Sequence, residues 1–412
     1  MIARIADTYI KSFSGLSREV WLLAVVMLIN RSGMMVLPFI TLYVSDELGM
    51  GLIRAGYIAS AFGVGSLTGS LLGGYLSDRI GTYEVILMAL IVGGLGFIIL
   101  SMITTFYGLL LGIFIVVTIT DAARPATMTA VATYSTEEAK TRSISLIRLA
   151  INLGISIGPA VAGLLATSVG YFWLFVGDGV TCILAGLFFW MMLSPKKQRN
   201  HPEESHSEES SEPITSVYED GYFLLYLFLL MIGLIAFFQI LSTAPLFLEN
   251  ELGLTKTQIG LFFTANGLLI FLFEMPIVYT LERIKNAMLW VVVGGIMIAS
   301  SYYILSMLGP VWLIVSLYTI FISFGEILNF PFSNTIALSR GKGKKLGQFM
   351  GLYTMTFSIS LILAPIIGTY IIEHSSYRMA WKAISIIAII SMTGLFFMKN
   401  KVNQEAITDT DN

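Results

Sequence analysis

The sequence has little charge, few histidines and a single cysteine. Charged residues make up 12% of its 412 residues, against about 25% in a typical soluble protein, which excludes an ordinary soluble globular fold. Cys182 alone cannot form an intramolecular disulfide framework. The 24 Lys and Arg are balanced by 26 Asp and Glu, so no basic field favours nucleic acid. The G-x-x-x-x-G-K-[ST] phosphate loop of ATP-driven pumps is absent, and so are the clustered His, Cys or carboxylate residues of a membrane-embedded enzyme.

Long apolar stretches dominate the composition, because 56% of the residues are hydrophobic. A helix needs about 20 mostly apolar residues to cross a bilayer. Twelve such stretches occur, at 19–44, 54–76, 85–104, 106–133, 144–168, 170–194, 221–248, 257–280, 286–308, 310–338, 347–373 and 379–398. The sequence therefore predicts an all-α integral membrane protein with twelve transmembrane helices in two six-helix halves, residues 1–194 and 221–400.

Two polar segments lie outside these stretches. Residues 195–220 are rich in Lys, Glu, Ser and His, and they predict a flexible linker between the halves. His201 and His206 lie in this linker without a companion cysteine, so solvated side chains are favoured over a metal site. Residues 401–412 are equally polar and predict a disordered tail.

The distribution of basic residues predicts the orientation. Seventeen Lys and Arg fall on the side that carries both termini and the linker, and four fall on the opposite side. Basic residues gather on the cytoplasmic side of membrane proteins. We therefore expect a multi-pass protein whose N- and C-termini both lie in the cytoplasm.

The two halves contain related sequences. Residues 45–63 align with residues 249–267 at a constant offset of 204, which pairs glycines with glycines at several positions. The same offset pairs the Asp-Arg-Ile at 78–80 with the Glu-Arg-Ile at 282–284. Because each half has an even number of spans, the repeats share one orientation, as in transporters whose substrate site lies near the midplane between parallel repeats.

Two segments carry recognisable motifs. Residues 74–81 read Gly-Tyr-Leu-Ser-Asp-Arg-Ile-Gly, and residues 154–163 read Gly-Ile-Ser-Ile-Gly-Pro-Ala-Val-Ala-Gly. The first resembles the G-x-L-x-D-R-x-G signature of the major facilitator superfamily, although Thr82 and Tyr83 replace the two basic residues that follow it. The second is similar to the pattern G-x-x-x-G-P-x-x-G-G of its antiporter members, with Ala162 in place of one glycine.

Two shorter segments point to one branch of that superfamily. The Arg-Pro-Ala step at 124–126 and the Asn-Leu-Gly step at 152–154 resemble the bacterial twelve-span drug:proton antiporters. The resemblance implies the two-half major facilitator fold in a bacterial inner membrane. It also implies a monomer that exports small molecules, with the proton gradient as its energy source and no cofactor.

The motif residues are candidates for gating: Gly74, Asp78, Arg79, Gly81, Gly154, Gly158 and Pro159. Asp78 is expected to act as a latch against the N-terminus of the eleventh span near Gly347, where the helix dipole favours an anion. A surface salt bridge at a helix end is the alternative. Gly154 and Gly158 form a GxxxG face that lets helices approach closely, and Pro159 favours a kink. Ordinary close packing within one half explains the same three residues equally well.

Polar residues also lie near the middle of four spans. A charged side chain at the bilayer centre costs at least about 2.5–3.5 kcal/mol, so each one is a candidate functional residue. The first, fourth, seventh and tenth spans carry these polar residues: Asn30, Arg31, Asp121, Arg124, Gln239 and Glu326. In the fold that the chain resembles, these four spans line the central cavity. We therefore expect Arg31, Arg124, Gln239 and Asn30 to face the substrate.

Glu326 and Asp121 are the candidates for proton coupling. Asp121 and Arg124 are three residues apart and share a helix face, and a permanent ion pair would make Asp121 a poor proton carrier. Glu326 has no basic neighbour in its own helix, and burial favours the protonated form of an unpaired carboxylic acid. Glu326 is therefore the first choice and Asp121 the second. The alternative is that Asp121–Arg124 and Arg31–Glu326 are static pairs that fix helix packing.

Three further charges lie outside these four spans. Arg148 in the fifth span and Glu274 in the eighth lie at matching depth and predict a gate pair between the halves. Asp178 in the sixth span is expected to pair internally, for instance with Arg31, instead of contacting substrate.

Several functions remain open. The leading one is a proton-coupled exporter of small amphipathic molecules. The alternatives are a proton-coupled importer of a small anionic solute or peptide, gripped by Arg31 and Arg124, and a membrane receptor or scaffold that transports nothing. An enzyme is not expected.

Overall fold

The computed structural model describes residues 16–135, 140–194, 217–281, 286–340 and 346–408. Within these ranges the secondary structure is helical and contains no strands. Twelve segments of this part of the chain are long and apolar enough to cross a membrane. They coincide with the predicted spans, and the largest shift of an end is from 104 to Leu100 in the third. The all-α class with twelve transmembrane helices is therefore confirmed. Most of the predicted linker lies outside the described residues.

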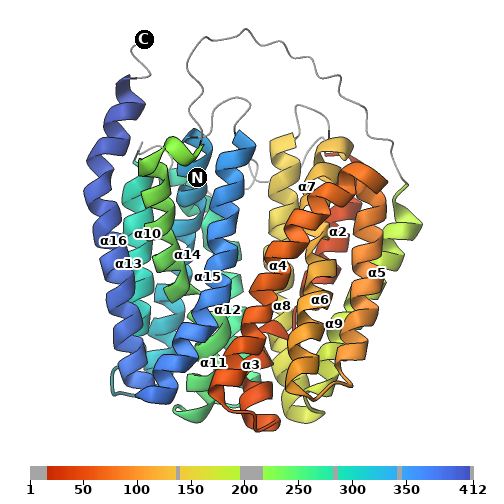
Figure 1. The fold of residues 1–412 in the computed structure, drawn as a ribbon, viewed down its shortest axis with the longest axis horizontal. Coiled ribbons are helices and arrows are strands. Elements are labelled where there is room, and N and C mark those ends of the chain that lie inside the picture. The colour runs from red at the N-terminus through yellow and green to blue at the C-terminus, as the bar shows by residue number, and fades with distance from the viewer. Residues whose placement is uncertain (1–15, 136–139, 195–216, 282–285, 341–345, 409–412) are drawn as a thin grey trace, which may run out of the picture. The chain divides into compact units, whose positions relative to one another are not determined.

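The chain forms two compact units, Met1–Val36 with Gly65–Ser210 and Leu37–Val64 with Ser211–Asn412. The first unit is built from α2 (Arg18–Ser32), the later part of α4 (Leu52–Ile80), α5 (Thr82–Leu100), α6 (Phe106–Asp121), α7 (Ala123–Tyr134), α8 (Lys140–Ser168) and α9 (Phe172–Met192). Within this unit α2 packs against α8 and α9, and α5 packs against α6, α7 and α9. The helices run alongside one another, as Figure 1 shows.

The second unit contains the remaining elements. Its early part comprises η1 (Leu37–Phe39), α3 (Ile40–Leu42), the π-helical turn η2 (Tyr43–Glu47) and the beginning of α4. Its later part comprises η4 (Val217–Glu219), α10 (Gly221–Phe237), α11 (Gln239–Asn250), α12 (Lys256–Leu281), α13 (Ala287–Leu305), α14 (Val311–Arg340), α15 (Leu346–His374) and α16 (Tyr377–Thr408). Helix α13 packs against α14 and α16, and α10 packs against α15 and α16.

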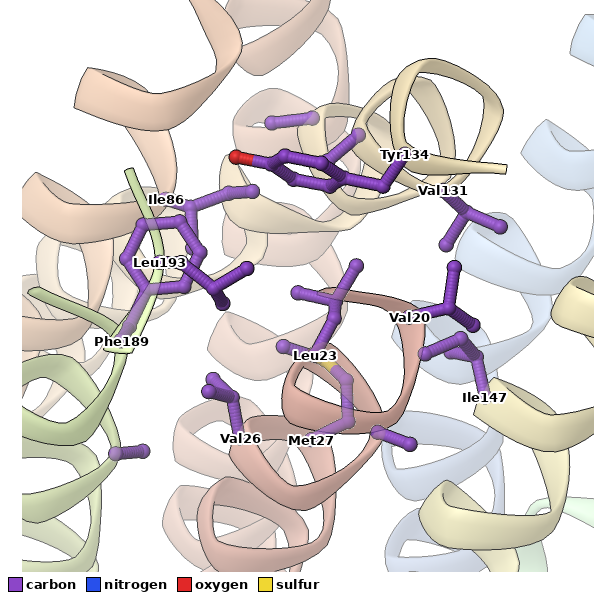
Figure 2. Packing of buried hydrophobic residues seen from close by; sticks show 14 of the residues in the cluster. Val20, Leu23, Val26, Met27, Ile86, Val131, Tyr134, Ile147, Phe189 and Leu193 are labelled. Atoms are coloured by element: carbon purple, nitrogen blue, oxygen red, sulfur yellow. The ribbon is translucent and has the colours of Figure 1, made fainter. Parts of the chain in front are cut away.

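Aliphatic side chains fill the core of the first unit at one end of its helices. Figure 2 shows Leu23 and Met27 of α2 surrounded by Ile86 of α5, Ile147 of α8 and Phe189 of α9. Each of these side chains is at most 4% exposed, and between membrane helices such side chains contribute close van der Waals packing. This core fixes α2, and α2 carries two of the predicted site residues.

Aromatic side chains contribute to the corresponding core of the second unit. Phe223 and Tyr226 of α10 stack on each other, and Phe223 also packs against Phe349 of α15, with the ring centroids 4.7 Å apart. Offset and tilted ring pairs add about 0.5–1.5 kcal/mol beyond the area that they bury. Asp220 also holds the start of α10. Its side chain accepts a hydrogen bond from the amide of Phe223, and its Oδ2 lies 2.8 Å from Nε of Arg340 in α14.

Glycines let α4 approach two different partners. A Cβ at Gly69 or Gly73 would meet the backbone of α6 and of the residue that follows it, at Thr118 and Ala122. A Cβ at Gly63 would lie 2.8 Å from the amide nitrogen of Ile362 in α15. The later part of α4 therefore belongs to the first unit and its beginning to the second, as the division of the chain at Val64 also indicates.

The offset found in the sequence reappears in the helices. Helix α12 begins at Lys256, 204 residues after Leu52 at the start of α4, and α14 begins 205 residues after α6 (311 − 106). Helix α16 continues to Thr408, further than the predicted tail boundary at 401 allows. Its Lys, Gln, Glu and Ala residues are good helix formers and extend an existing helix without a new nucleation step.

Candidate functional site

The mid-span polar residues lie where their helices are irregular. In the first span α2 ends at Ser32, residues 33–36 are not helical, and a 3₁₀ turn begins at Leu37. Gly33 provides the C-cap, and Pro38 has no amide hydrogen with which to continue a helix. Arg31 therefore lies in the last turn before a break.

The fourth span is interrupted at Asp121. Helix α6 ends at Asp121 and α7 begins at Ala123. Pro125 explains the interruption, because its ring replaces the amide hydrogen that would bond the carbonyl of the residue four positions earlier, which is Asp121. The carboxylate of Asp121 and the guanidinium of Arg124 consequently lie on either side of a helix junction.

Three charged side chains of the first unit form one cluster. Arg124 Nη2 donates to Asp121 Oδ2 at 3.0 Å, which confirms the predicted pairing. Ser66 of α4 also donates a hydrogen bond to Asp121, and Arg31 acts electrostatically on the same carboxylate. The Asp121 side chain is 12% exposed and that of Arg124 is 46% exposed. The carboxylate of Asp121 therefore interacts with two arginines, and the Arg124 side chain is exposed.

Arg31 is packed by the glycine motif of α8. A Cβ at Gly154 would lie 2.6 Å from Arg31 Cβ, and one at Gly158 would lie 3.0 Å from the carbonyl oxygen of Met34. The GxxxG face therefore packs on the broken end of α2 within the first unit, and α8 continues helically through Pro159. Among the described residues, the buried Nε of Arg31 has no hydrogen-bond partner.

Asp178 of α9 has a role that the sequence did not indicate. Its Oδ1 accepts a hydrogen bond from the amide of Met35, and its Oδ2 accepts one from the amide of Val36, both at 3.0 Å. These amides belong to the break in the first span, where no helical carbonyl is available to them. Asp178 does pair internally, as expected, but its hydrogen-bond partners are backbone amides instead of Arg31. A glycine and a proline flanking four residues of a span are the sequence signal that such amides need an acceptor.

Asn30 is also engaged with α9. Its Nδ2 donates to the Sγ of Cys182 at 3.2 Å, one turn along α9 from Asp178. The Asn30 side chain is half-buried, so its predicted contact with substrate stays a prediction.

Gln239 is the first residue of α11, directly after the break at Phe238 in the seventh span. Its Nε2 donates to the carbonyls of Ile235 (3.2 Å) and Ala364 (2.8 Å), and its Oε1 accepts from Thr243 at 2.6 Å. Ile235 is four residues before Gln239, so the side chain bonds the carbonyl that a continuous helix would offer to the Gln239 amide. Gln239 is fully buried and joins α11 to α15 in this conformation.

Glu326 lies in the middle of α14, next to the carbonyl of Ile327 that Pro331 leaves without its helical donor. Its side chain is half-buried. The structure records no hydrogen bond or ion pair of Glu326 to any residue that it describes. Its charged neighbour is Glu274 of α12, which acts on it electrostatically, and α12 packs against α14. Sequence reasoning assigned Glu274 to a gate and missed this proximity, since the two residues are far apart in the chain.

The remaining motif residues lie at the end of α4 and on α8. Helix α4 ends at Ile80, and Gly81 has φ +101°, a conformation that favours glycine and makes the predicted tight turn. Arg79 is exposed and places its Cζ 4.7 Å from the centroid of the Tyr75 ring. The side chain of Asp78 lies outside the described residues, so the latch stays a prediction.

The predicted pair of Arg148 and Glu274 also stays a prediction. Arg148 is exposed on α8 of the first unit, and Glu274 is half-buried on α12 of the second. Near Gly74 no atom lies within 4 Å of the position of a Cβ. Within the described ranges no three His, Cys, Asp or Glu residues gather into a possible metal site.

The sequence of the chain is similar to sequences of membrane transporters. The profile of the Major Facilitator Superfamily matches residues 20–341 and 240–411. The chain is 22% identical to the "Uncharacterized MFS-type transporter YttB" of Bacillus subtilis (strain 168), over 95% of this chain and 98% of that one. It is also 22% identical to a "Na(+), Li(+), K(+)/H(+) antiporter" of Planococcus maritimus, over 82% of this chain and 85% of that one.

Solved structures share the same fold. A POT family transporter in complex with 5-aminolevulinic acid matches with a TM-score of 0.79 at 16% identity, over 95% of this chain and 98% of that one. The nucleoside transporter NupG matches with a TM-score of 0.74 at 14% identity, over 92% and 99%. Twelve membrane-crossing helices and the matched profile agree, so this membrane transporter belongs to the Major Facilitator Superfamily.

Proposed function

We propose that this transporter exchanges protons for small amphipathic molecules, which it exports, and that Glu326 carries the coupling proton. The proposal depends on one observation. Glu326 lies inside a membrane span, and no cation or hydrogen-bond donor among the described residues compensates its charge. An ionised carboxylate in that setting is costly, so a proton is the simplest compensating ligand.

The neighbouring carboxylate supports the same assignment. Glu274 acts electrostatically on Glu326 from the adjacent helix. Two carboxylates that act on each other inside a membrane disfavour the state in which both are ionised. A change in the surroundings of either residue would then bind or release a proton, which is what coupling requires.

Asp121 is a weaker candidate for this role. Its carboxylate already accepts from Arg124 and Ser66 and lies in the field of Arg31. Protonating it would leave two arginines without their shared anion. Asp121 is therefore better suited to organise the arginines than to carry a proton across the membrane.

The direction of transport is inferred from sequence. The glycine motif at 154–163 resembles that of antiporters, and one relative is named a cation/proton antiporter. The excess of basic residues on one side favours cytoplasmic termini. In an antiporter, protons that enter down their gradient drive another solute out. Proton-coupled uptake of an anionic solute is the second candidate, because the buried Nε of Arg31 is without a partner among the described residues.

Everted membrane vesicles test the proposal. Respiration acidifies the vesicle lumen, acridine orange reports the pH gradient, and the probes are ethidium, sodium chloride and potassium chloride added separately. For the wild type, ethidium should collapse the gradient, whereas a response to sodium or potassium chloride alone would contradict the export of amphipathic molecules. Glu326→Gln should abolish that response while exchange of radiolabelled probe across de-energised vesicles continues. Glu373→Gln, an exposed carboxylate at the end of α15, is the matched control and should behave as the wild type. An unchanged response in Glu326→Gln would remove Glu326 from the coupling role.

A further inference from the structure

The break in the first span is held by a carboxylate from another helix. Both oxygens of Asp178 are used, one for each of two consecutive amides, Met35 and Val36. Asp178 is 6% exposed, so water does not replace these bonds. Backbone amides in a membrane must be satisfied internally. Asp178 therefore makes a non-helical conformation stable at a depth where a continuous helix would otherwise be favoured.

Helix α9 matches the shape of the break as well as its hydrogen bonds. A Cβ at Gly33 would collide with the side chain of Thr181, and a Cβ at Gly177 would lie 2.8 Å from Met35 Sδ. Asn30 donates to Cys182 on the same face of α9. The residues that end α2 and those that form the break thus contact one face of α9, on which Asp178 is central.

The break coincides with the boundary between the compact units. The first stretch of the first unit ends at Val36, whose amide donates to Asp178, and the first stretch of the second unit begins at Leu37. Beyond the boundary, Thr41 donates to the carbonyl of Ser242 in α11 at 2.7 Å. The first span is therefore divided, with Arg31 in one unit and residues 37–47 packed in the other.

In the second unit, the backbone at the corresponding break is bonded by a side chain other than a carboxylate. This break at Phe238 lies 204 residues after Met34 (34 + 204 = 238), and Gln239 satisfies it from within the same span. At the 205-residue offset between the starts of α9 and α16 (377 − 172), the position equivalent to Asp178 is Ala383, which is half-buried on α16. The carboxylate device is thus a property of the first span and not of the repeat.

We propose that Asp178 is a positioning residue of the transport cycle. It holds residues 33–36 in their non-helical conformation, so that Asn30 and Arg31 keep their place at the end of α2 independently of residues 37–47. A transporter must change conformation during its cycle. A span that is interrupted at one point can bend there, and Asp178 supplies the hydrogen bonds for that point. This role does not depend on the coupling residue or on the cargo.

The test compares Asp178→Asn with a matched control. An asparagine at this position can accept a hydrogen bond from one of the two backbone amides, but its side-chain NH2 group faces the other backbone amide and cannot accept from it. Asp220→Asn removes a carboxylate that caps an ordinary helix and pairs with Arg340, so it reports the effect of losing a capping carboxylate in general. Each variant is purified, inserted into nanodiscs and measured by hydrogen–deuterium exchange and by maleimide labelling.

Two readouts separate positioning from mere stabilisation. The amides of Met35 and Val36 should exchange about 10- to 100-fold faster in Asp178→Asn, since hydrogen bonds to a charged group are lost. A cysteine introduced by Thr41→Cys, in a Cys182→Ser background, should also react faster with N-ethylmaleimide when Asp178→Asn is present. Thr41 is fully buried in the wild type, so a less firmly held break exposes this position more often. Asp220→Asn should leave both rates unchanged.

Two results would overturn the proposal. One is unchanged exchange at Met35 and Val36. The other is a Thr41→Cys labelling rate that Asp178→Asn and Asp220→Asn alter equally, which would reduce Asp178 to a stabilising residue. If Asp178→Asn does not fold, Asp178→Glu keeps the charge with a longer side chain, and it should alter both rates in the same direction by a smaller factor.

Discussion

The ion pair of Asp121 and Arg124 provides a quantitative test of the charged cluster. The perturbation is a double-mutant cycle of Asp121→Asn, Arg124→Met and the variant with both changes. Such a cycle isolates the coupling energy between two residues in contact. The structure predicts the size of the coupling energy. It also predicts which of the two single variants loses more free energy of unfolding.

The size follows from the partial burial of the pair. Exposed ion pairs contribute about 0.2–1 kcal/mol, and removing one partner of a fully buried pair costs about 3–5 kcal/mol. Asp121 is 12% exposed and Arg124 is 46% exposed, with 3.0 Å between Nη2 and Oδ2. Solvent screening at Arg124 brings the expected coupling to about 1–2 kcal/mol.

The inequality follows from Arg31. Arg124→Met leaves Asp121 with Arg31 and with the hydrogen bond from Ser66. Asp121→Asn instead leaves Arg31 and Arg124 close together without the anion that both act on, so their like charges repel each other. Asp121→Asn should therefore be the more destabilising single change.

The measurement is unfolding by sodium dodecyl sulfate in mixed micelles, followed by circular dichroism. Single and double variants are compared at one detergent composition to obtain differences in free energy of unfolding. Additive effects, within about 0.3 kcal/mol, would show that the pair is not coupled in the folded protein. A greater loss for Arg124→Met would refute the position given to Arg31.

Two further predictions concern packing and use the same unfolding measurement. Gly73→Ala should destabilise by about 1–3 kcal/mol, because its Cβ would lie 2.6 Å from Ala122 Cα. The adjacent Gly74→Ala has free space and should be neutral or stabilising by up to about 1 kcal/mol; equal losses would contradict the α4 packing. Gln239→Leu should cost about 1–3 kcal/mol, since it leaves the buried carbonyl of Ala364 without its donor, and a smaller loss than for the exposed Gln348→Leu would contradict this account.

The spans could be predicted because the signal for each is local. Twenty apolar residues carry enough information to place a membrane helix, and the ends shifted by only a few residues. The pairing of Asp121 with Arg124 was equally local, since residues three apart on a helix share a face. Gly81 was predictable for a related reason, because a glycine after an Asp-Arg-Ile helix end signals a turn with positive φ.

The contacts that give the site its chemistry are not local. Asp178 binds amides more than 140 residues earlier in the chain, and Glu274 acts on Glu326 from a different helix. The assignment of Leu37–Val64 to the second unit has the same origin, because it depends on which backbone the glycines of α4 approach. A repeat in the sequence reports common architecture, but it does not report which neighbours a segment packs against in one conformation.

The repeat nevertheless relates the irregular points of the two halves once the structure is known. Asp121, at the junction of α6 and α7, corresponds to Glu326 at the 205-residue offset between α6 and α14 (121 + 205 = 326), and Glu326 lies beside the carbonyl that Pro331 leaves free. Met34 and Phe238 are 204 residues apart, and both lie in breaks. Equivalent points of the two halves thus carry different polar groups, with Asp121, Arg124 and Asp178 near those of the first unit and Gln239 and Glu326 at those of the second. Irregular helix geometry frees backbone groups, and polar side chains are tolerated in a membrane where such groups need partners. The cationic cluster and the uncompensated carboxylate can therefore occupy related positions in a common scaffold while performing different tasks.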